Sequence, residues 1–290
     1  MAPELKNIDL HMHSNVSDGT DSPKELLALV KEKKISLFSL TDHDALNGAM
    51  EIQNHLDQFP EPLLFLRGVE LSCQDARGKY HILGYQYDRK GGPLHQMVQK
   101  AHDIRLEKVT ARLDFLKREF GFSFREEDVR ALFQNHNPGK PHIAKMMVTY
   151  GYAESVSDAM KRFLNKKKFP NVALPPEKAI GSIIDSGGTA ILAHPAYGDG
   201  DQLILGEDMD QRIRYLMDFG LQGMECYYSS FTPRIIEEML DLAGKYQLFV
   251  TAGSDYHGSN KLVCLGDTNL PAPQDRAPGF HAFLKAVQVI

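Results

Sequence analysis

Imidazole and carboxylate side chains, the groups that bind transition metals and transfer protons, recur along the whole chain. Two motifs alternate, His11-Met12-His13 and Asp255-Tyr256-His257, so in an extended segment the outer side chains of each point the same way. Further candidates are Asp18, Asp42, His43, Glu70, His81, His194 and Glu225. Because so many ligands exceed the coordination shell of one ion, the sequence predicts a cluster of two or three divalent ions, with a carboxylate such as Glu70 as the bridge.

The residue types limit which metals the site would bind and in which cellular compartment the protein is expected. Imidazoles and carboxylates without cysteine favour Mn, Fe or Zn over Mg or Ca. The three cysteines, Cys73, Cys226 and Cys264, show no paired spacing, which indicates a reducing cytoplasm rather than a disulfide framework. We find no signal segment and no apolar run long enough to span a bilayer, and we expect a cytoplasmic protein without membrane contact.

Most of the candidate ligands follow short apolar segments that are typical of buried strands. The expected strands are residues 8–11, 36–41, 63–70, 80–85, 189–194, 221–226 and 248–253. The third is expected to end at Glu70, and His81 is the exception because it stands near the start of the fourth. Helical patterns at 23–34, 177–185 and 234–246 lie between strands, which predicts parallel strands with crossovers. We therefore expect a distorted seven-stranded (β/α)7 barrel, whose ligands gather where the carboxyl ends of the strands meet.

Residues 95–175 interrupt this pattern with helical segments expected at 95–118, 125–133, 140–150 and 155–164. The sequence thus predicts a metal-binding barrel over 1–94 and 176–290 and an inserted all-helical subdomain over 95–175 that caps the substrate. Residues 95–168 carry a charge of +6 in a protein whose net charge is −5, which indicates that this part holds anions. The candidate phosphate contacts are Lys140 and His142 at a helix start, with Arg105 and Arg130. Glu225 stands at a strand end and is a candidate acid that either supports a metal ligand or contacts the substrate.

The composition excludes several classes of protein. The chain has 290 residues, 42% of them hydrophobic and 24% charged, which is ordinary for a globular protein and argues against disorder, collagen or a coiled coil. A net negative charge and the absence of nucleic-acid-binding motifs make a long nucleic acid an unfavoured partner. Phe120, Phe122 and Phe124 could stack a base, but packing within the insert explains them better.

With these motifs in order along the chain, the sequence resembles the PHP (polymerase and histidinol phosphatase) superfamily of metal-dependent phosphoesterases. The resemblance is carried by residues 9–14, 17–19, 40–44, 68–72, 81, 193–195 and 253–257. The insertion, with Gly139-Lys140-Pro141-His142, is similar to that of the subgroup acting on nucleoside monophosphates, 3′,5′-bisphosphates or short RNA.

The resemblance implies three ligand sets. One ion would take His11, His13, Glu70 and Asp255; a second would share Glu70 and take His81 and His194; a third would take Asp18, His43 and His257. Many trinuclear relatives carry histidine where this chain has Asp18. His194 or His257 would protonate the leaving group if it is free of metal, and either Asp42 or Asp44, which flank His43, would orient an imidazole.

The resulting functional prediction is hydrolysis of a phosphomonoester of a small nucleotide, AMP-like or a 3′,5′-bisphosphonucleoside, by a metal-bridging hydroxide. Three alternatives remain open: a histidinol-phosphate phosphatase, a 5′-3′ exonuclease on short oligoribonucleotides, and a catalytically inactive regulatory or binding module. No protein partner is inferred.

Overall fold

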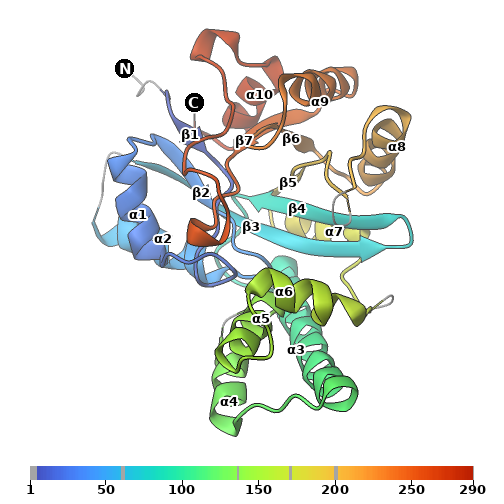
Figure 1. Ribbon diagram of the computed structural model, residues 1–290. Coiled ribbons are helices and arrows are strands. Elements are labelled where there is room, and N and C mark those ends of the chain that lie inside the picture. The colour runs from blue at the N-terminus through green and yellow to red at the C-terminus, as the bar shows by residue number, and fades with distance from the viewer. Residues whose placement is uncertain (1–4, 60–62, 136, 170–171, 199–201, 290) are drawn as a thin grey trace. The chain divides into compact units, whose positions relative to one another are not determined.

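Seven short apolar segments form one mixed sheet in a computed structural model that describes residues 5–59, 63–135, 137–169, 172–198 and 202–289 (Figure 1). The strands neighbour one another in chain order. They are β1 (Ile8–Asp9), β2 (Leu37–Leu40), β3 (Leu64–Asp75), β4 (Gly78–Tyr85), β5 (Thr189–Leu192), β6 (Gly223–Tyr228) and β7 (Phe249–Gly253). Their side chains are largely buried, as expected for strands of a barrel that is filled inside and covered by helices outside.

The sheet nearly closes on itself where the first and last strands meet. The backbone N–H of Leu10 donates to the carbonyl of Ala252 at 2.9 Å, and Met12 forms a parallel bridge with Tyr256. These bonds bring the ends of β1 and β7 together, although about 240 residues separate them in the chain. The predicted distorted seven-stranded α/β barrel is confirmed.

One strand runs against the direction that the sequence predicted. β4 pairs antiparallel with both β3 and β5, whereas the other neighbouring pairs are parallel. The turn between β3 and β4 is too short for a crossover, and the Asp75 carboxylate fixes it by accepting from the N–H groups of Arg77 and Gly78. The expectation that the third strand ends at Glu70 was wrong, because β3 continues to Asp75 as one arm of this hairpin.

Six helices of the first compact unit, Met1–Val98 with Leu174–Ile290, surround the sheet. They are α1 (Pro23–Glu32), α2 (Asn47–Gln58), α7 (Pro176–Asp185), α8 (Gly206–Met217), α9 (Pro233–Lys245) and α10 (Pro278–Ala286). α7 packs on β4, α9 on β6 and α10 on β7 (Figure 1). The capping box between Ser22 and Glu25 starts α1 where the sequence predicted a helix. The sequence did not predict α2 and α8, which lack a side-chain N-cap bond, or α10.

The second compact unit, Gln99–Ala173, is helical. It contains most of α3 (Pro93–Phe120), then α4 (Glu126–Gln134), α5 (Lys140–Thr149) and α6 (Val156–Arg162). Its own core includes Val109, Leu116, Ile143, Met147 and Leu164. Phe120, Phe122 and Phe124 pack against this core, as predicted, and the Phe122 ring stacks on Tyr152 at 4.2 Å.

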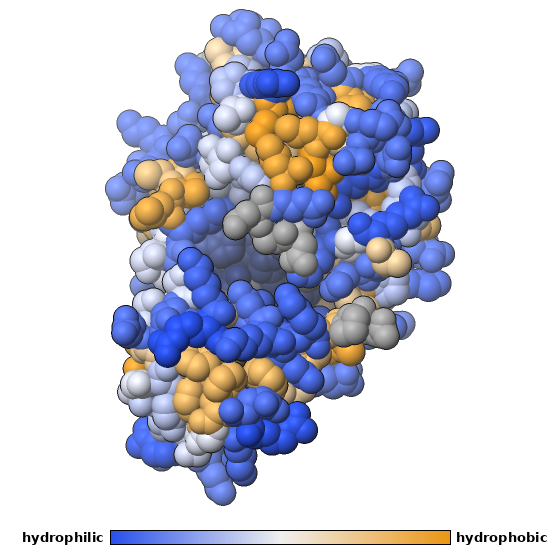
Figure 2. All heavy atoms as spheres, turned by 45° about the vertical axis from the view of Figure 1, so that its right-hand side comes forward, coloured by the Kyte–Doolittle hydropathy of each residue, from blue (hydrophilic) through white to orange (hydrophobic). Residues whose placement is uncertain are grey.

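Hydrophilic side chains cover most of the face drawn in Figure 2, and apolar side chains show there as separate patches. Separate apolar patches are normal on a folded protein. In the part of the chain that the structure describes, each helix is too short or too polar to cross a lipid bilayer.

Candidate metal centre

Glu70 lies at the centre of a group of imidazoles and has no solvent exposure. One carboxylate oxygen, Oε1, lies 3.0 Å from His81 Nδ1 and 3.2 Å from His194 Nε2. The other, Oε2, lies 3.3 Å from His11 Nε2, 3.1 Å from His13 Nε2 and 3.1 Å from His43 Nδ1. Five imidazoles from four separate stretches of sequence therefore converge on one carboxylate.

The barrel places these side chains through backbone bonds. The N–H of Asp255 donates to His11 O at 2.7 Å and the N–H of His13 to Tyr256 O at 2.8 Å, which fixes the segments after β1 and β7 side by side. A parallel bridge sets His43 beside Glu70. Because β4 is antiparallel, His81, which pairs with Ser72, lies at the rim where the parallel strands end. The strand direction thus explains the one ligand that did not fit the strand-end pattern.

Asp255 brings a second carboxylate to the group. Its Oδ1 lies 3.5 Å from His11 Nε2, 3.3 Å from His13 Nε2 and 3.4 Å from His257 Nδ1. Its backbone has a φ of +57°, a left-handed conformation in which aspartate occurs more often than most residues. The unusual backbone turns the side chain of Asp255 back toward the end of β1.

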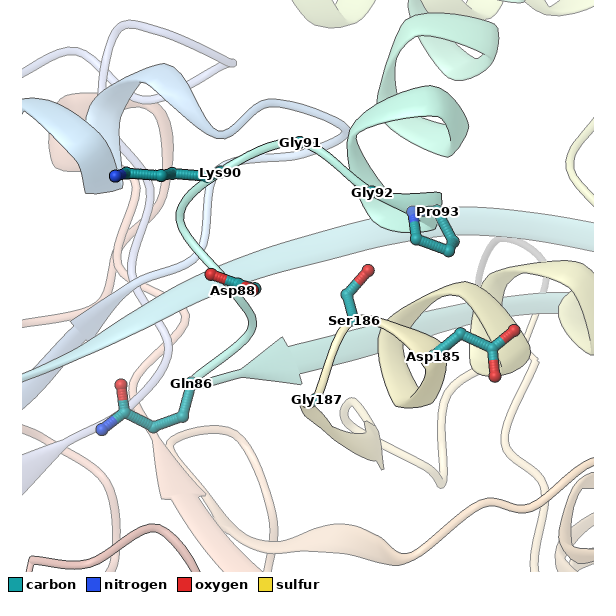
Figure 3. Close-up of a pocket in the computed structure, with 9 residues that line it drawn as sticks. All are labelled: Gln86, Asp88, Lys90, Gly91, Gly92, Pro93, Asp185, Ser186 and Gly187. Atoms are coloured by element: carbon teal, nitrogen blue, oxygen red, sulfur yellow. The ribbon is translucent and has the colours of Figure 1, made fainter.

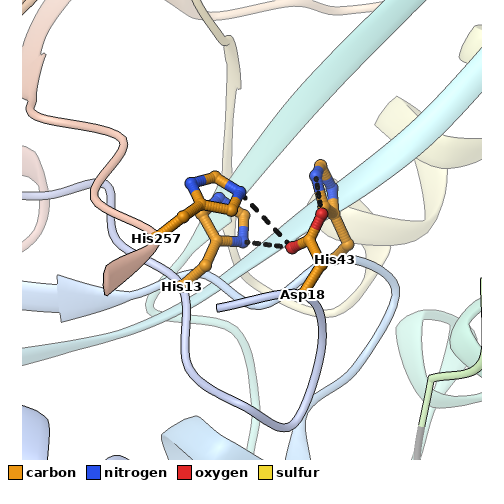
Figure 4. A group of neighbouring side chains, drawn as sticks. All are labelled: His13, Asp18, His43 and His257. Carbon is orange, nitrogen blue, oxygen red and sulfur yellow. Dashed lines mark ion pairs between the residues drawn. The ribbon is translucent and has the colours of Figure 1, made fainter. Parts of the chain in front are cut away.

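Asp18 joins three imidazoles at the edge of the group (Figure 4). Its Oδ1 lies 3.3 Å from His257 Nε2 and 3.8 Å from His13 Nδ1, and its Oδ2 lies 4.0 Å from His43 Nε2. One ligand atom from each of these four residues lies within 4.8 Å of the others, which is close enough for them to share an ion.

Three sets of ligand atoms lie within 4.8 Å of one another among the described residues. They are His13, Asp18, His43 and His257; His11, His13 and Glu70; and His43, Glu70 and His81. His13, His43 and Glu70 each belong to two sets, an arrangement that suits neighbouring ions with shared ligands. The structure brings together all nine residues predicted as ligands, and places His13 with the set of Asp18 as well.

The chemistry of these contacts fits metal ions. His11 Nε2 lies 3.1 Å from His13 Nε2, and His81 Nδ1 lies 3.2 Å from His194 Nε2. Because two lone pairs repel each other, each of these contacts needs either a proton or a metal ion between the two nitrogens. Glu70 Oε2 and Asp18 Oδ1 are buried and accept no hydrogen bond from the described residues, in spite of the imidazoles nearby. Buried carboxylate oxygens that accept no hydrogen bond are costly unless a cation satisfies them.

Electrostatics give the ligands different proton affinities. Burial lowers the pKa of His13, but Asp255 and Glu70 outweigh this effect and raise it to about 10. Burial lowers the pKa of His43 to about 3. The surrounding imidazoles hold the pKa of Glu70 and that of Asp255 well below their usual values in spite of burial. A divalent ion that enters must therefore displace a proton from His13, whereas His43 is neutral and the two carboxylates are already ionised.

Two buried acids, Glu225 and Asp42, orient the ligands through hydrogen bonds. Glu225 has no exposure; its Oε1 lies 3.0 Å from His11 Nδ1 and its Oε2 accepts from the His194 N–H at 2.8 Å. Asp42 accepts from Ser14 Oγ and Ser17 Oγ, each at 2.7 Å, and Ser17 Oγ lies 3.5 Å from His13 Nδ1. Glu225 thus orients one imidazole directly, while Asp42 acts on another through a serine.

The other predicted substrate contacts lie in the second unit. Lys140 Nζ donates to Asn165 Oδ1 at 2.8 Å, and His142 Nδ1 accepts from the Gly139 N–H at 3.3 Å, at the start of α5. Arg105 Nη1 approaches within 3.6 Å of the position that a Cβ on Gly139 would take. Arg130 is exposed on α4. Arg105 and the start of α5 thus come together, and the binding of phosphate there stays a prediction.

Sequence reasoning missed several residues that support the ligands. Asp9 accepts from the N–H and hydroxyl of Ser254 at 3.0 and 2.6 Å and thereby ties β1 to the segment after β7. Tyr228 and Lys261 both bond Asp255. Asp9 and Ser254 stand inside the motifs, whereas Tyr228 and Lys261 lie outside them and carry no such signal.

A separate pocket of about 410 Å³ lies at the opposite ends of β4 and β5 (Figure 3). It is lined by Gln86, Asp88, Lys90, Gly91, Gly92, Pro93, Asp185, Ser186 and Gly187. Gln86 follows the last residue of β4, and Gly187 lies two residues before the first residue of β5. His81 and His194 lie toward the other end of these strands. This pocket contains none of the predicted site residues.

The sequence pattern of the PHP domain matches residues 9–168, more than half of the chain. The chain belongs to the PHP family. It is 28% identical to a 3′,5′-nucleoside bisphosphate phosphatase of Chromobacterium violaceum, over 87% of this chain and 88% of that protein. It is 25% identical to the 5′-3′ exoribonuclease Rnm of Escherichia coli, over 89% of this chain and 87% of that protein.

Solved structures agree with this membership. A putative metal-dependent phosphoesterase from Bifidobacterium adolescentis superposes with a TM-score of 0.80 and 25% identity, over 98% of this chain and 97% of that one. An amidohydrolase from Chromobacterium violaceum with bound sulfate and no metal superposes with a TM-score of 0.79 and 26% sequence identity, over 97% of this chain and 96% of that one. The PHP family protein described here is thus a metal-dependent phosphoesterase, a hydrolase.

Proposed function

We propose that this PHP phosphoesterase removes a phosphoryl group from a phosphomonoester of a small nucleotide, AMP-like or a 3′,5′-bisphosphonucleoside. The observation that carries the proposal is the convergence of five imidazoles on Glu70, because such a group of Lewis bases serves metal-assisted hydrolysis. The similarity to a 3′,5′-nucleoside bisphosphate phosphatase over most of both chains supports the substrate class.

The proposed ligands are the seven residues of the three sets together with His194 and Asp255, which contact members of those sets: His11, His13, Asp18, His43, Glu70, His81, His194, Asp255 and His257. Two or three divalent ions of Mn, Fe or Zn type, when bound, would lower the pKa of water and offset the charge of the phosphoryl oxygens.

The chain itself orients these ligands. Glu225 holds His11 through Nδ1, so the Nε2 atom of that ring faces Glu70 and Asp255. A ring nitrogen that binds an ion cannot also deliver a proton. The proton-donor role predicted for His194 or His257 therefore requires one of them to stay outside the ligand set.

The basic helical unit would bind the rest of the substrate. We assign Arg105, Lys140 and His142 to a phosphate of the nucleotide, because the start of a helix and two cations favour an anion. Arg130 is assigned to the same role on charge alone.

A second candidate is a 5′-3′ exonuclease on short oligoribonucleotides. The resemblance to the exoribonuclease Rnm of Escherichia coli and the basic charge of residues 95–168 favour it. It needs the same metal ligands and differs in the length of the substrate.

A phosphate-release screen tests the proposal. The full chain with added Mn²⁺ is offered AMP, 3′,5′-bisphosphoadenosine, histidinol phosphate and short 5′-phosphorylated oligoribonucleotides, with His11→Ala as the inactive control. We expect release from the nucleotides and little from histidinol phosphate. Preferred cleavage of the oligoribonucleotides would favour the second candidate. Metal-loaded protein that is inert on all of them would contradict the proposal and favour a binding module.

A further inference from the structure

The two oxygens of the Asp255 carboxylate have different surroundings. Oδ1, the inner oxygen, faces His11, His13 and His257 at 3.3 to 3.5 Å. Oδ2, the outer oxygen, accepts from the Tyr228 hydroxyl at 2.8 Å and from the Lys261 ammonium. Only the inner oxygen therefore points into the group of imidazoles.

The Tyr228 hydroxyl stands on a rigid support. Tyr228 is the last residue of β6 and is 3% exposed. Its ring packs against Phe231 at 5.0 Å and Tyr197 at 5.9 Å, and its carbonyl accepts from Asn269 Nδ2 at 2.8 Å. The backbone bond and the packed ring leave the hydroxyl little freedom to move away from Asp255.

Lys261 determines the direction of the Tyr228 hydroxyl. Its ammonium lies 2.8 Å from the Tyr228 oxygen and also bonds the outer oxygen of Asp255. An ammonium has three donors and no acceptor, so the Tyr228 oxygen must accept from Lys261. The hydroxyl hydrogen is then free to point only at Asp255.

We propose that Tyr228 is a positioning residue, whose hydroxyl, directed by Lys261, holds the outer oxygen of Asp255 so that the inner oxygen alone serves as a metal ligand. This inference rests on the proposed function in that it takes Asp255 as a ligand. Hydrogen bonds of this kind orient ligating carboxylates, and their loss typically weakens metal affinity about 10- to 100-fold.

The chain offers a matched control in the same unit. Tyr246 donates to Asp210 Oδ1 at 2.8 Å, and Lys245 Nζ bonds the same oxygen at 2.6 Å. This second tyrosine, lysine and aspartate set lies on α8 and at the end of α9. Tyr228→Phe and Tyr246→Phe thus remove the same kind of bond, one beside the metal centre and one outside it.

The test is titration of the metal-free, full-length protein with Mn²⁺ in competition with a chromophoric chelator, which gives the Mn²⁺ affinity. The number of metal ions bound per chain is measured in parallel. We expect Tyr228→Phe to weaken the affinity about 10- to 100-fold while Tyr246→Phe leaves it unchanged. Thermal melting of the metal-free variants shows whether they are folded. A double mutant that combines Tyr228→Phe with Asp255→Asn tests whether Tyr228 acts through Asp255. If Tyr228 acts through Asp255, Tyr228→Phe has little further effect in that background.

Two outcomes would overturn the inference. One is a Tyr228→Phe protein that melts normally and binds Mn²⁺ as tightly as the original chain. The other is a full additional loss of affinity when Tyr228→Phe is combined with Asp255→Asn. Failure of the proposed function looks different, because the original chain would then bind no Mn²⁺ at this centre, or would bind it and release no phosphate.

Discussion

Replacement of Glu70 by glutamine tests whether the charge of the central carboxylate is needed for metal binding. The change keeps the size of the side chain and removes one buried charge that five imidazole nitrogens approach within 3.3 Å. Removal of one partner from a buried charged pair costs about 3–5 kcal/mol. At about 1.4 kcal/mol per factor of ten, that energy corresponds to a metal affinity lower by roughly a hundredfold to a few thousandfold. The amide nitrogen would also place hydrogens among imidazole nitrogens that now face the carboxylate.

The assay for Glu70→Gln is metal titration followed by phosphate release at saturating Mn²⁺. Glu177→Gln, an exposed change in the first turn of α7, is the matched control and should alter neither quantity. We expect activity to fall with the bound metal, and the circular dichroism spectrum to stay that of a folded protein. A folded Glu70→Gln protein that binds metal and hydrolyses substrate like the original chain would refute the role given to Glu70.

Three further predictions concern packing, orientation and pH. Gly253→Ala places a Cβ 2.2 Å from His11 Cβ, so we expect the free energy of unfolding, measured by urea titration, to fall by about 1–3 kcal/mol. The control is Gly244→Ala, whose Cβ meets no atom within 4 Å and should not destabilise the protein. Glu225→Gln should lower kcat about 10- to 100-fold because it weakens the hold on His11 Nδ1; unchanged kinetics would contradict this. The pKa of His13 is raised from 6.5 to about 10, so its contribution to the stability of the metal-free protein is complete below pH 6.5 and is lost as pH rises through about 10. Urea midpoints in chelator should show this decline, and His13→Gln should remove it.

The barrel could be predicted from the sequence because its strands are short and apolar and its ligands follow them. The direction of β4 could not, since the rule that strand–helix alternation gives parallel strands does not apply to the short turn after Asp75. The same error placed the end of the third strand at Glu70. The position of His81 was the one sign in the sequence that β4 runs the other way.

The supporting residues were harder to predict than the ligands. Histidine and acid types reveal a metal site, whereas tyrosine and lysine are common and reveal a role only through contact. Tyr228 bonds Asp255 across 27 positions of sequence, and Lys261 bonds it from the segment after β7. Glu225 was predicted either to support a metal ligand or to contact the substrate, and the choice needed the structure, in which the side chain is fully buried with Oε1 3.0 Å from His11 Nδ1.

The most direct measurement is anomalous X-ray diffraction from crystals of the full chain soaked in Mn²⁺. The account predicts at least two anomalous peaks, each within about 2.0–2.3 Å of imidazole or carboxylate atoms of the proposed ligands, with Glu70 shared between neighbouring peaks. Crystals that diffract well and show no peak among His11, Glu70, His194 and Asp255 would contradict it.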